Sequence, residues 1–403
     1  MGFVPRQLPR WSELRPLVRL RPPAVGPRAR ARQATDVDDL RRLARRGVPR
    51  ATFDYVDGGA GAELSLARSR AAFDRVEFRP RVLRDVSDVD TGTTLLGRAA
   101  TMPLVLAPTG FTRLMHHEGE HAVAAAAAAA GVPYTLSTMG TVKPEELTGA
   151  GDRWFQLYLW RDRGATKDLV ARAAAAGYRA LMLTVDTPVS GARLRDLRNG
   201  LTIPPDLTPR TLAGMAARPA WWFNLLTTPP LTFASLTGTE GGLAATVDRV
   251  FDPRVTLADL EWLREVWPGP LIVKGVQCAA DARAVVEAGA DAVAVSNHGG
   301  RQLDRAVTPL EELPAVLDAV DGRAEVYVDG GVRTGADAVA AVGLGADACL
   351  IGRAYLYGLM AGGQDGVARA LEIFRADLRR TLALLGVPRV ADLGPDAVRL
   401  RPR

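Results

Sequence analysis

Short apolar runs alternate with alanine-rich or leucine-rich segments along most of the chain. Eight runs have the length and composition of buried β-strands, at residues 104–107, 134–137, 155–159, 181–185, 271–274, 292–296, 325–328 and 349–351. Helix-like segments lie between most of them, for example at 120–130, 167–176, 279–288 and 336–344. Eight strands that alternate with helices predict an α/β fold, a closed parallel (β/α)8 or TIM barrel with its helices outside.

An open, doubly wound sheet is the alternative architecture for such alternation. That fold usually carries a glycine fingerprint at the start of an early helix. None follows the first predicted strand, so the barrel is favoured.

The barrel pattern divides the chain into an arm, a domain and an insertion. Residues 1–35 are rich in proline and arginine and predict a flexible basic arm. Residues 36–403 form the barrel domain, which opens with a helical extension whose first helix spans 36–46. Residues 194–253, between the fourth and fifth strands, exceed an ordinary connection and predict a lid or interaction loop.

The net charge of +6 is unevenly distributed. Residues 1–35 hold eight arginines against Glu13 alone, a charge of 8 − 1 = +7, so residues 36–403 carry 6 − 7 = −1. The body therefore gives no electrostatic support for nucleic-acid binding. The basic arm has two interpretations. The simpler one is a solvated tail, and the more specific one is a segment that is attracted to anionic lipid.

The cysteine content indicates a reducing compartment, and the apolar runs indicate neither a membrane span nor a secretory signal. Cys278 and Cys349 are the only cysteines, which excludes a disulfide framework and favours the cytoplasm. The uncharged runs at 122–142 and 219–239 are interrupted by glycine or proline, so neither predicts a membrane span. The arm lacks the continuous apolar stretch of a secretory signal.

Polar residues and glycines recur where the predicted strands end, which is where TIM barrels gather their chemistry. These positions are Pro108, Thr109, Gly110, Ser137, Gln156, Tyr158, Thr184, Asp186, Lys274, Ser296, His298, Arg301, Asp329, Gly330, Gly331, Gly352 and Arg353.

His298 and Arg301 give the most specific chemical signal among them. Histidine is suited to proton transfer near neutral pH, and arginine binds carboxylates through two parallel hydrogen bonds. A lone histidine after a strand is more often structural, but the neighbouring arginine favours a general base beside a carboxylate clamp.

The last two strand ends predict a phosphate site. Gly330, Gly331 and Gly352 allow backbone N–H groups to approach a ligand closely, and Arg333 and Arg353 supply guanidinium groups. TIM barrels commonly bind phosphate after strands seven and eight.

Several of these segments resemble one known family. FQLY, LTVD, VKG, SNHGGRQLD, DGG and IGR occur in the order found in FMN-dependent α-hydroxy acid oxidases and dehydrogenases. The resemblance runs from about residue 36 to the C-terminus. Within the family, APTGFTRLMH, GARLRDLRNG and GRAYLYGLMAGG resemble the actinobacterial L-lactate dehydrogenase type.

The resemblance implies a set of catalytic roles. His298 would take the proton from the substrate, and Asp186 would stabilise the resulting imidazolium. Lys274 would lie against the flavin edge on which negative charge develops during reduction.

It also implies how the substrate is held. Arg193 and Arg301 would bind its carboxylate, and Tyr55 and Tyr158 would hydrogen-bond it. Met139 occupies a position that lines the side-chain pocket in relatives, and its adaptable apolar side chain is consistent with a short aliphatic acid.

The implied cofactor is FMN. Ser137, Gln156 and Thr184 would contact the flavin ring, and Arg333 and Arg353 its phosphate. The other expected cofactor residues are Pro108, Thr109, Gly110, Lys274, Ser296, Asp329, Gly330, Gly331 and Gly352. Gly110 replaces an alanine frequent in the family and opens space near the reactive flavin atom, so reactivity with oxygen is left open.

Two further motifs carry weaker signals. His117 to His121 matches the HExxH zinc pattern, but the pattern needs a third ligand and one helix face, so we expect no metal. Trp221, Trp222 and Phe223 in the insertion could form a satellite core or a membrane contact. We expect peripheral attachment to the inner face of the membrane through this segment, helped by the arm.

The sequence thus predicts an enzyme that oxidises a small L-2-hydroxy acid, L-lactate above all, and passes electrons to a quinone or another respiratory acceptor. One alternative is an oxidase that makes hydrogen peroxide, and another is a non-catalytic flavin-binding barrel at the membrane. We expect a homotetramer or homo-octamer. The natural acceptor, and the choice between hydride and carbanion mechanisms, are left open.

Overall fold

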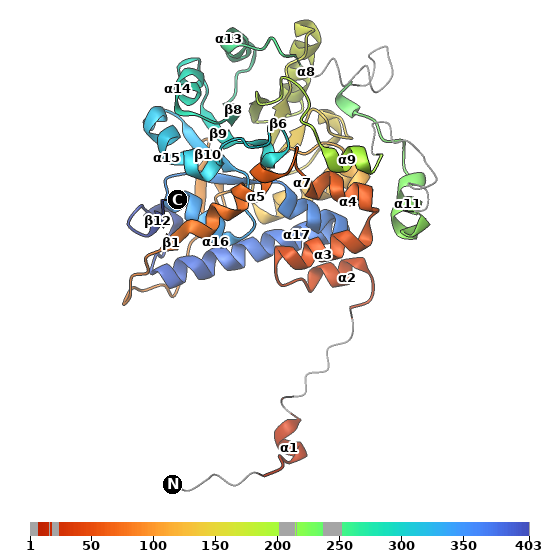
Figure 1. Cartoon of the computed structure of the whole chain (residues 1–403), viewed down its shortest axis with the longest axis vertical. Helices are drawn as coiled ribbons and strands as arrows, with labels where there is room; N and C mark the ends of the chain where they lie inside the picture. The colour runs from red at the N-terminus through yellow and green to blue at the C-terminus, as the bar shows by residue number, and fades with distance from the viewer. Residues whose placement is uncertain are drawn as a thin grey trace.

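The computed structural model describes residues 7–15, 17, 24–200, 214, 216–236 and 252–402. Eight parallel strands close into a barrel in the order β10-β11-β4-β5-β6-β7-β8-β9 (Figure 1). They are β4 (Leu104–Leu106), β5 (Tyr134–Ser137), β6 (Arg153–Leu157), β7 (Ala180–Thr184), β8 (Leu271–Val276), β9 (Ala292–Ser296), β10 (Glu325–Asp329) and β11 (Ala348–Ile351). The predicted TIM barrel and all eight predicted strands are confirmed.

The strands are mainly apolar because both of their faces are buried. Alternate side chains, such as Trp154 and Met182, fill the barrel interior, where the Trp154 and Tyr327 rings stack with centroids 6.0 Å apart. Their neighbours, such as Phe155 and Leu181, join the larger core that includes the surrounding helices. This two-sided burial follows from the alternation of side chains along a strand.

Helices cover the outside of the barrel, as Figure 1 shows. The predicted helices at 120–130, 167–176, 279–288 and 336–344 are present to within a few residues. The outer helices are α7 (Gly119–Ala130), α8 (Arg163–Ala175), α13 (Leu257–Val266), α14 (Ala279–Glu287), α15 (Pro309–Val320), α16 (Gly335–Gly343) and α17 (Arg353–Leu385), with the short α6 (Thr112–Met115) after β4.

Two small sheets complete the ends of the barrel. β2 (Thr93–Leu95) and β3 (Arg98–Ala100) form a hairpin whose Leu95 and Ala100 join the interior cluster. β1 (Val76–Phe78) pairs antiparallel with β12 (Val398–Leu400). Short 3-10 helices lie at η1 (Phe73–Arg75), η2 (Pro144–Glu146), η4 (His298–Gly300) and η5 (Val390–Asp392).

Four N-terminal helices contact the barrel domain. They are α2 (Pro27–Arg32), α3 (Val37–Gly47), α4 (Arg50–Asp57) and α5 (Leu64–Ala71), and the last two reach the cavity at the carboxyl ends of the strands. The short α1 (Trp11–Leu14) has no buried residue. The expectation that the flexible arm extends to residue 35 is wrong for α2. Ala31 is fully buried, and Arg32 pairs with Asp365 at 2.9 Å. A Cβ at Gly362 of α17 would lie 2.7 Å from the Ala31 Cβ, so the absence of one lets α2 approach closely. Arginines at alternate positions hide this contact in the sequence.

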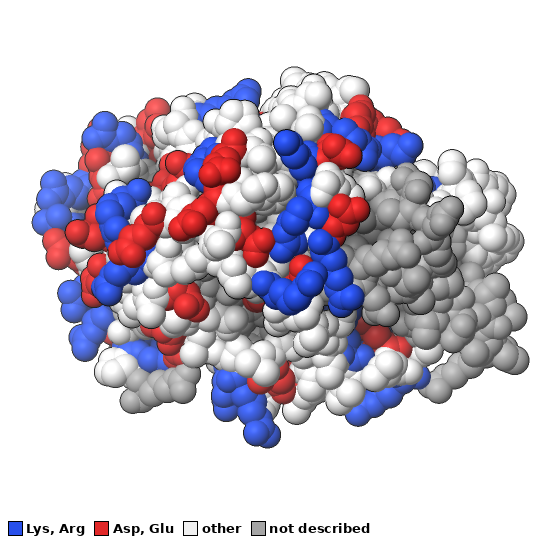
Figure 2. Space-filling view, turned by 90° about the horizontal axis from the view of Figure 1, so that it is seen from above, with Lys and Arg blue, Asp and Glu red and all other residues white. Residues whose placement is uncertain are grey.

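The connection from β7 to β8 contains α9 (Leu194–Arg198), α11 (Pro219–Leu226) and η3 (Ala234–Leu236) before α13. Residues 201–213, 215 and 237–251 of the predicted insertion lie outside the described residues, so its role as a lid stays a prediction. None of the helices in the described part of the chain has the length and apolar character to cross a bilayer. On the face seen in Figure 2, acidic and basic side chains lie side by side.

Candidate active site

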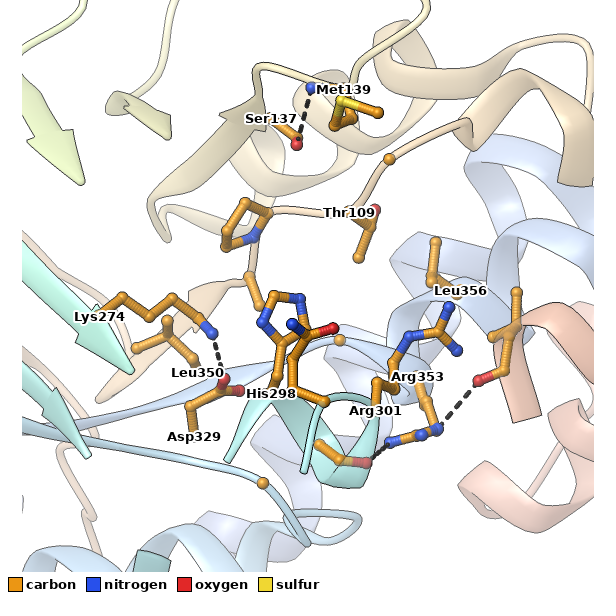
Figure 3. Close-up of a pocket in the computed structure, with 18 of the residues that line it drawn as sticks. Thr109, Ser137, Met139, Lys274, His298, Arg301, Asp329, Leu350, Arg353 and Leu356 are labelled. Atoms are coloured by element: carbon orange, nitrogen blue, oxygen red, sulfur yellow. Dashed lines mark hydrogen bonds and ion pairs between the residues drawn. The ribbon is translucent and has the colours of Figure 1, made fainter. Parts of the chain in front are cut away.

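A cavity opens at the carboxyl ends of the barrel strands (Figure 3). It brings together His298, Lys274 and all five expected substrate residues. Most expected cofactor residues also line it, namely Pro108, Thr109, Gly110, Ser137, Lys274, Asp329, Gly330, Gly331, Arg333, Gly352 and Arg353. Asp186, Gln156, Thr184 and Ser296 do not line this cavity and are largely or fully buried instead.

His298 follows β9 in a tight turn and contacts Asp186 from the loop after β7. The distance from His298 Nδ1 to Asp186 Oδ1 is 3.0 Å, and the Asp186 side chain is only 3% exposed. Burial opposes ionisation of Asp186, but His298 and then Lys274 outweigh it and lower the pKa of the carboxyl. The bond to Nδ1 leaves Nε2 of His298 available for proton transfer.

The backbone conformation at His298 and Gly275 allows the contact between His298 and Asp186. His298 has a φ of 56° and Gly275 a φ of 106°. A Cβ on Gly275 would lie 2.7 Å from the Asp186 Cβ. Glycine at 275 is therefore required for Asp186 to reach His298.

Lys274, Ser296 and Asp329 form a buried network on neighbouring strands. Lys274 Nζ lies 2.7 Å from Asp329 Oδ2 and donates to Ser296 Oγ at 3.0 Å. Ser296 in turn donates to Asp329 at 2.7 Å. Burial alone would lower the pKa of Lys274, but Asp329 and Asp186 raise it, so a cation is fixed in the cavity wall.

Arg193 and Arg301 lie over the same aromatic ring. Their guanidinium carbons are 5.9 and 5.0 Å from the centroid of Tyr55. Burial and then the nearby Arg193 lower the pKa of Arg301, which has no carboxylate within ion-pair distance in the described part of the chain. Arg301 instead donates to the carbonyls of Tyr55 and Gly58. A small carboxylate would relieve this repulsion.

Arg353 and Arg333 stand at the last two strand ends, as expected for a phosphate site. Arg353 donates to the carbonyls of Val56, Gly299 and Gly58 at 2.9, 2.8 and 2.7 Å. Burial and then Arg301 lower its pKa to about 10. In Figure 3, Lys274 and Asp329 lie on one side of His298, and Arg301 and Arg353 lie on the other.

Residues 44–400 match the family model of FMN-dependent dehydrogenases. The chain belongs to this family. It is 52% identical over 396 residues to the "Putative L-lactate dehydrogenase" of Mycobacterium tuberculosis. The alignment covers 97% of this chain and 96% of that protein. It is 44% identical over 361 residues to the L-lactate oxidase of a Nostoc species, with coverage of 88% and 95%.

The fold comparison agrees. The crystal structure of the monotopic membrane protein (S)-mandelate dehydrogenase has a TM-score of 0.88 and 37% identity, and covers 91% of this chain and all of that one. The resemblance expected from SNHGGRQLD and its companion segments is thus confirmed. The protein is an FMN-dependent oxidoreductase that acts on hydroxy acids.

The residues around the cavity fit FMN. Gln156 Nε2 on β6 and Thr184 Oγ1 on β7 are buried and have no hydrogen-bond partner among the described residues. Buried polar groups without partners are costly, and the polar edge of a flavin ring would supply partners. Gly330 and Gly331, with φ of 124° and 83°, allow close approach of a phosphate to the backbone.

Two aromatic residues at or behind the cavity wall, Tyr355 and Phe233, are not indicated by the strand-end pattern. Tyr355 on α17 hydrogen-bonds Thr109 at 2.6 Å and donates to the Ala107 carbonyl at 2.9 Å, which fixes the end of β4. Phe233 reaches the cavity from the insertion and packs on Phe111 with ring centroids 4.6 Å apart. Neither residue follows a strand, so the strand-end rule could not find them. The aromatic pair in GRAYLYGLM was the available signal for Tyr355.

The histidines set aside as a zinc pattern lie at the start of α7. The structure groups His116, His117 and Glu118 within 4.8 Å, rather than the His117 and His121 of the pattern. Glu118 already forms an ion pair with Arg28 and accepts from the Gln364 N–H at 2.8 Å. These contacts give Glu118 a structural role, and the absence of a metal stays a prediction.

Proposed function

We propose that the protein oxidises L-lactate to pyruvate and passes the electrons to a quinone or a similar respiratory acceptor. The observation that carries the proposal is the His298–Asp186 pair beside Arg193 and Arg301 in one cavity. This arrangement offers a base and a carboxylate clamp to the same small molecule. The names of the L-lactate dehydrogenase and oxidase relatives support the choice of substrate.

The substrate carboxylate binds Arg193 and Arg301, and Tyr55 and Tyr158 hydrogen-bond the rest of the molecule. Met139 lines the side-chain pocket, where a methyl group fits. Binding of an anion beside two neighbouring cations offsets their repulsion, which favours hydroxy acids over hydroxy amides or esters.

His298 takes a proton from the substrate at Nε2. The ionised Asp186 then stabilises the imidazolium through Nδ1, which is the role suited to a buried carboxylate with a lowered pKa. FMN, when bound, would accept the two electrons and the second proton that the substrate loses as it becomes pyruvate. The Lys274 cation would stabilise the negative charge that develops on the flavin.

FMN would be held in two parts. Pro108, Thr109, Gly110, Ser137, Gln156, Thr184 and Ser296 surround the ring in this proposal. Asp329, Gly330, Gly331, Arg333, Gly352 and Arg353 surround its phosphate chain.

Two apolar side chains of α11 are exposed and are available for contact with a membrane. Phe223 and Leu226 on α11 are 58% and 72% exposed, and Trp221 Nε1 ties the helix to the Leu114 carbonyl at 2.8 Å. We infer peripheral attachment at the cytoplasmic face through α11 and the basic arm, residues 194–253 acting as a lid, and a homotetramer or homo-octamer. The membrane character of the (S)-mandelate dehydrogenase neighbour supports the contact.

The deciding experiment mixes the protein anaerobically with L-lactate, D-lactate, glycolate and L-mandelate and follows flavin absorbance. Rapid bleaching by L-lactate alone is the expected result. Admission of air then separates a dehydrogenase, which recolours slowly, from the peroxide-forming oxidase, which recolours at once. Bound FMN that bleaches with none of the four acids would instead favour the non-catalytic flavin-binding barrel.

A further inference from the structure

A second cavity, of about 570 Å³, lies between the N-terminal helices and the insertion. Its walls come from α3, α4, α9 and the residues that precede α11. Two aspartates, Asp54 and Asp57, line it together with six arginines, which are Arg41, Arg45, Arg50, Arg195, Arg198 and Arg218. The lining side chains thus carry a formal charge of 6 − 2 = +4.

Both aspartates are already committed to partners. Asp57 accepts from Arg41 at 2.6 and 2.9 Å, from Arg195 at 3.1 Å and from the Tyr357 hydroxyl at 2.8 Å. Asp54 accepts from Arg50 at 3.2 Å and from the Asn199 amide at 2.8 Å. These contacts hold α4 in place and leave no carboxylate for the other arginines.

Arg45, Arg198 and Arg218 have no carboxylate within 4.0 Å among the described residues. The Nε–H of Arg218 is buried and has no hydrogen-bond acceptor among the residues that the structure describes. Three guanidinium groups without a carboxylate partner in the described part of the chain face one cavity, so an anion bound there would be attracted by all three.

We propose that this arginine pocket binds a phosphate group, carried either by a small phosphorylated molecule or by an anionic lipid. A phosphate monoester carries about −1.5 to −2 at neutral pH and offers three acceptor oxygens to guanidinium groups, whereas a single carboxylate would neutralise less of the excess. The pocket is separate from the substrate cavity, and no step of hydroxy acid oxidation uses it. The inference therefore goes beyond the proposed function.

The test uses the FMN-loaded full chain and the Arg45→Gln/Arg198→Gln variant. These two arginines take no part in the ion pairs of Asp54 and Asp57, so the variant is expected to keep its flavin spectrum and melting temperature. Arg46→Gln/Arg161→Gln is the matched control, since it removes the same charge from exposed side chains outside the pocket.

Binding is measured by calorimetry with inorganic phosphate at constant ionic strength, and by sedimentation with phosphatidylglycerol or phosphatidylcholine vesicles. If the ligand is soluble, phosphate binds the wild type and the control, and its Kd rises at least tenfold in the pocket variant. If the source is a lipid, free phosphate does not bind, and the pocket variant alone sediments less with phosphatidylglycerol. The proposal is overturned if neither probe distinguishes the pocket variant from the control.

Discussion

The contact between His298 and Asp186 makes each side chain depend on the other. The histidine keeps the buried carboxylate ionised, and the carboxylate fixes which ring nitrogen faces the substrate. A change of one atom in Asp186 should therefore alter the chemistry while leaving the shape of the site intact.

Asp186→Asn is expected to slow reduction of the flavin by L-lactate about 10³- to 10⁴-fold. An amide cannot stabilise the imidazolium and can favour the wrong tautomer, and losses of this size follow the same change behind other catalytic histidines. Stopped-flow absorbance under anaerobic conditions measures the rate. Asp318→Asn, at an exposed position on α15, should react normally. A rate in Asp186→Asn close to wild type would remove Asp186 from the mechanism.

Strand-end residues could be predicted from the sequence because the barrel brings all carboxyl ends of its strands to one rim. His298, Lys274 and Asp329 were found in this way. The same rule could not tell lining residues from residues behind them. Gln156 and Ser296 turn into hydrogen-bond networks with Ser137 and Lys274, which depends on side-chain rotamers that spacing does not encode.

At the scale of elements, Asp57 joins four helices. It belongs to α4 and binds Arg41 of α3, Arg195 of α9 and Tyr357 of α17. Burial opposes its ionisation, but the bonds from Arg41 and Tyr357 outweigh burial and lower its pKa from 3.8 to about 2. The carboxylate therefore stabilises the fold above about pH 4, and this contribution is lost as the pH falls toward 2.

Asp57→Asn is expected to lower the free energy of unfolding by roughly 2 kcal/mol at pH 7. The difference from wild type should shrink between pH 4 and pH 2, where the native carboxylate becomes protonated. Urea unfolding at pH 7, 4 and 3 measures this, with Asp318→Asn as the control. A difference that stays constant over this range would show that the charge of Asp57 is not its source.

The exposed face of α11 gives a second test at this scale. Phe223→Ser/Leu226→Ser should reduce sedimentation with lipid vesicles at least several-fold, because two exposed apolar side chains would no longer enter the interface. Reduction of the flavin by L-lactate should be unchanged. Leu384→Ser, an exposed leucine on α17, is the control, and equal sedimentation of all three proteins would exclude α11 as the contact.

Elements were predicted well where burial dictates composition. Strands enclosed on both faces are apolar over most of their length, so all eight stand out in the sequence. α2 was missed because a single buried residue, Ala31, holds it against a glycine of α17. Such a contact has no periodic pattern.

At the scale of the whole molecule, the basic residues of the N-terminal arm are separate from those of the catalytic cavity. The first 25 residues carry five arginines against Glu13, a charge of 5 − 1 = +4, while the residues that line the catalytic cavity begin only at Tyr55. Deletion of residues 1–25 should weaken binding to phosphatidylglycerol vesicles, by about 1 kcal/mol for each arginine near the surface. Flavin bleaching by L-lactate should not change. Undiminished vesicle binding at low salt would mean that the arm stays in solution.

The barrel is closed by pairing of β4 with β11, in which Leu106 lies opposite Ile351. These strands are 351 − 106 = 245 residues apart, so on the ribosome β4 emerges long before its partner. At roughly 5–20 residues per second, the wait is about 12–49 s. During that time an apolar strand edge is exposed to other chains, and chaperones that shield nascent chains should matter most in this interval. A polypeptide released before Cys349 would keep that edge open and would also lack Gly352 and Arg353 of the cavity.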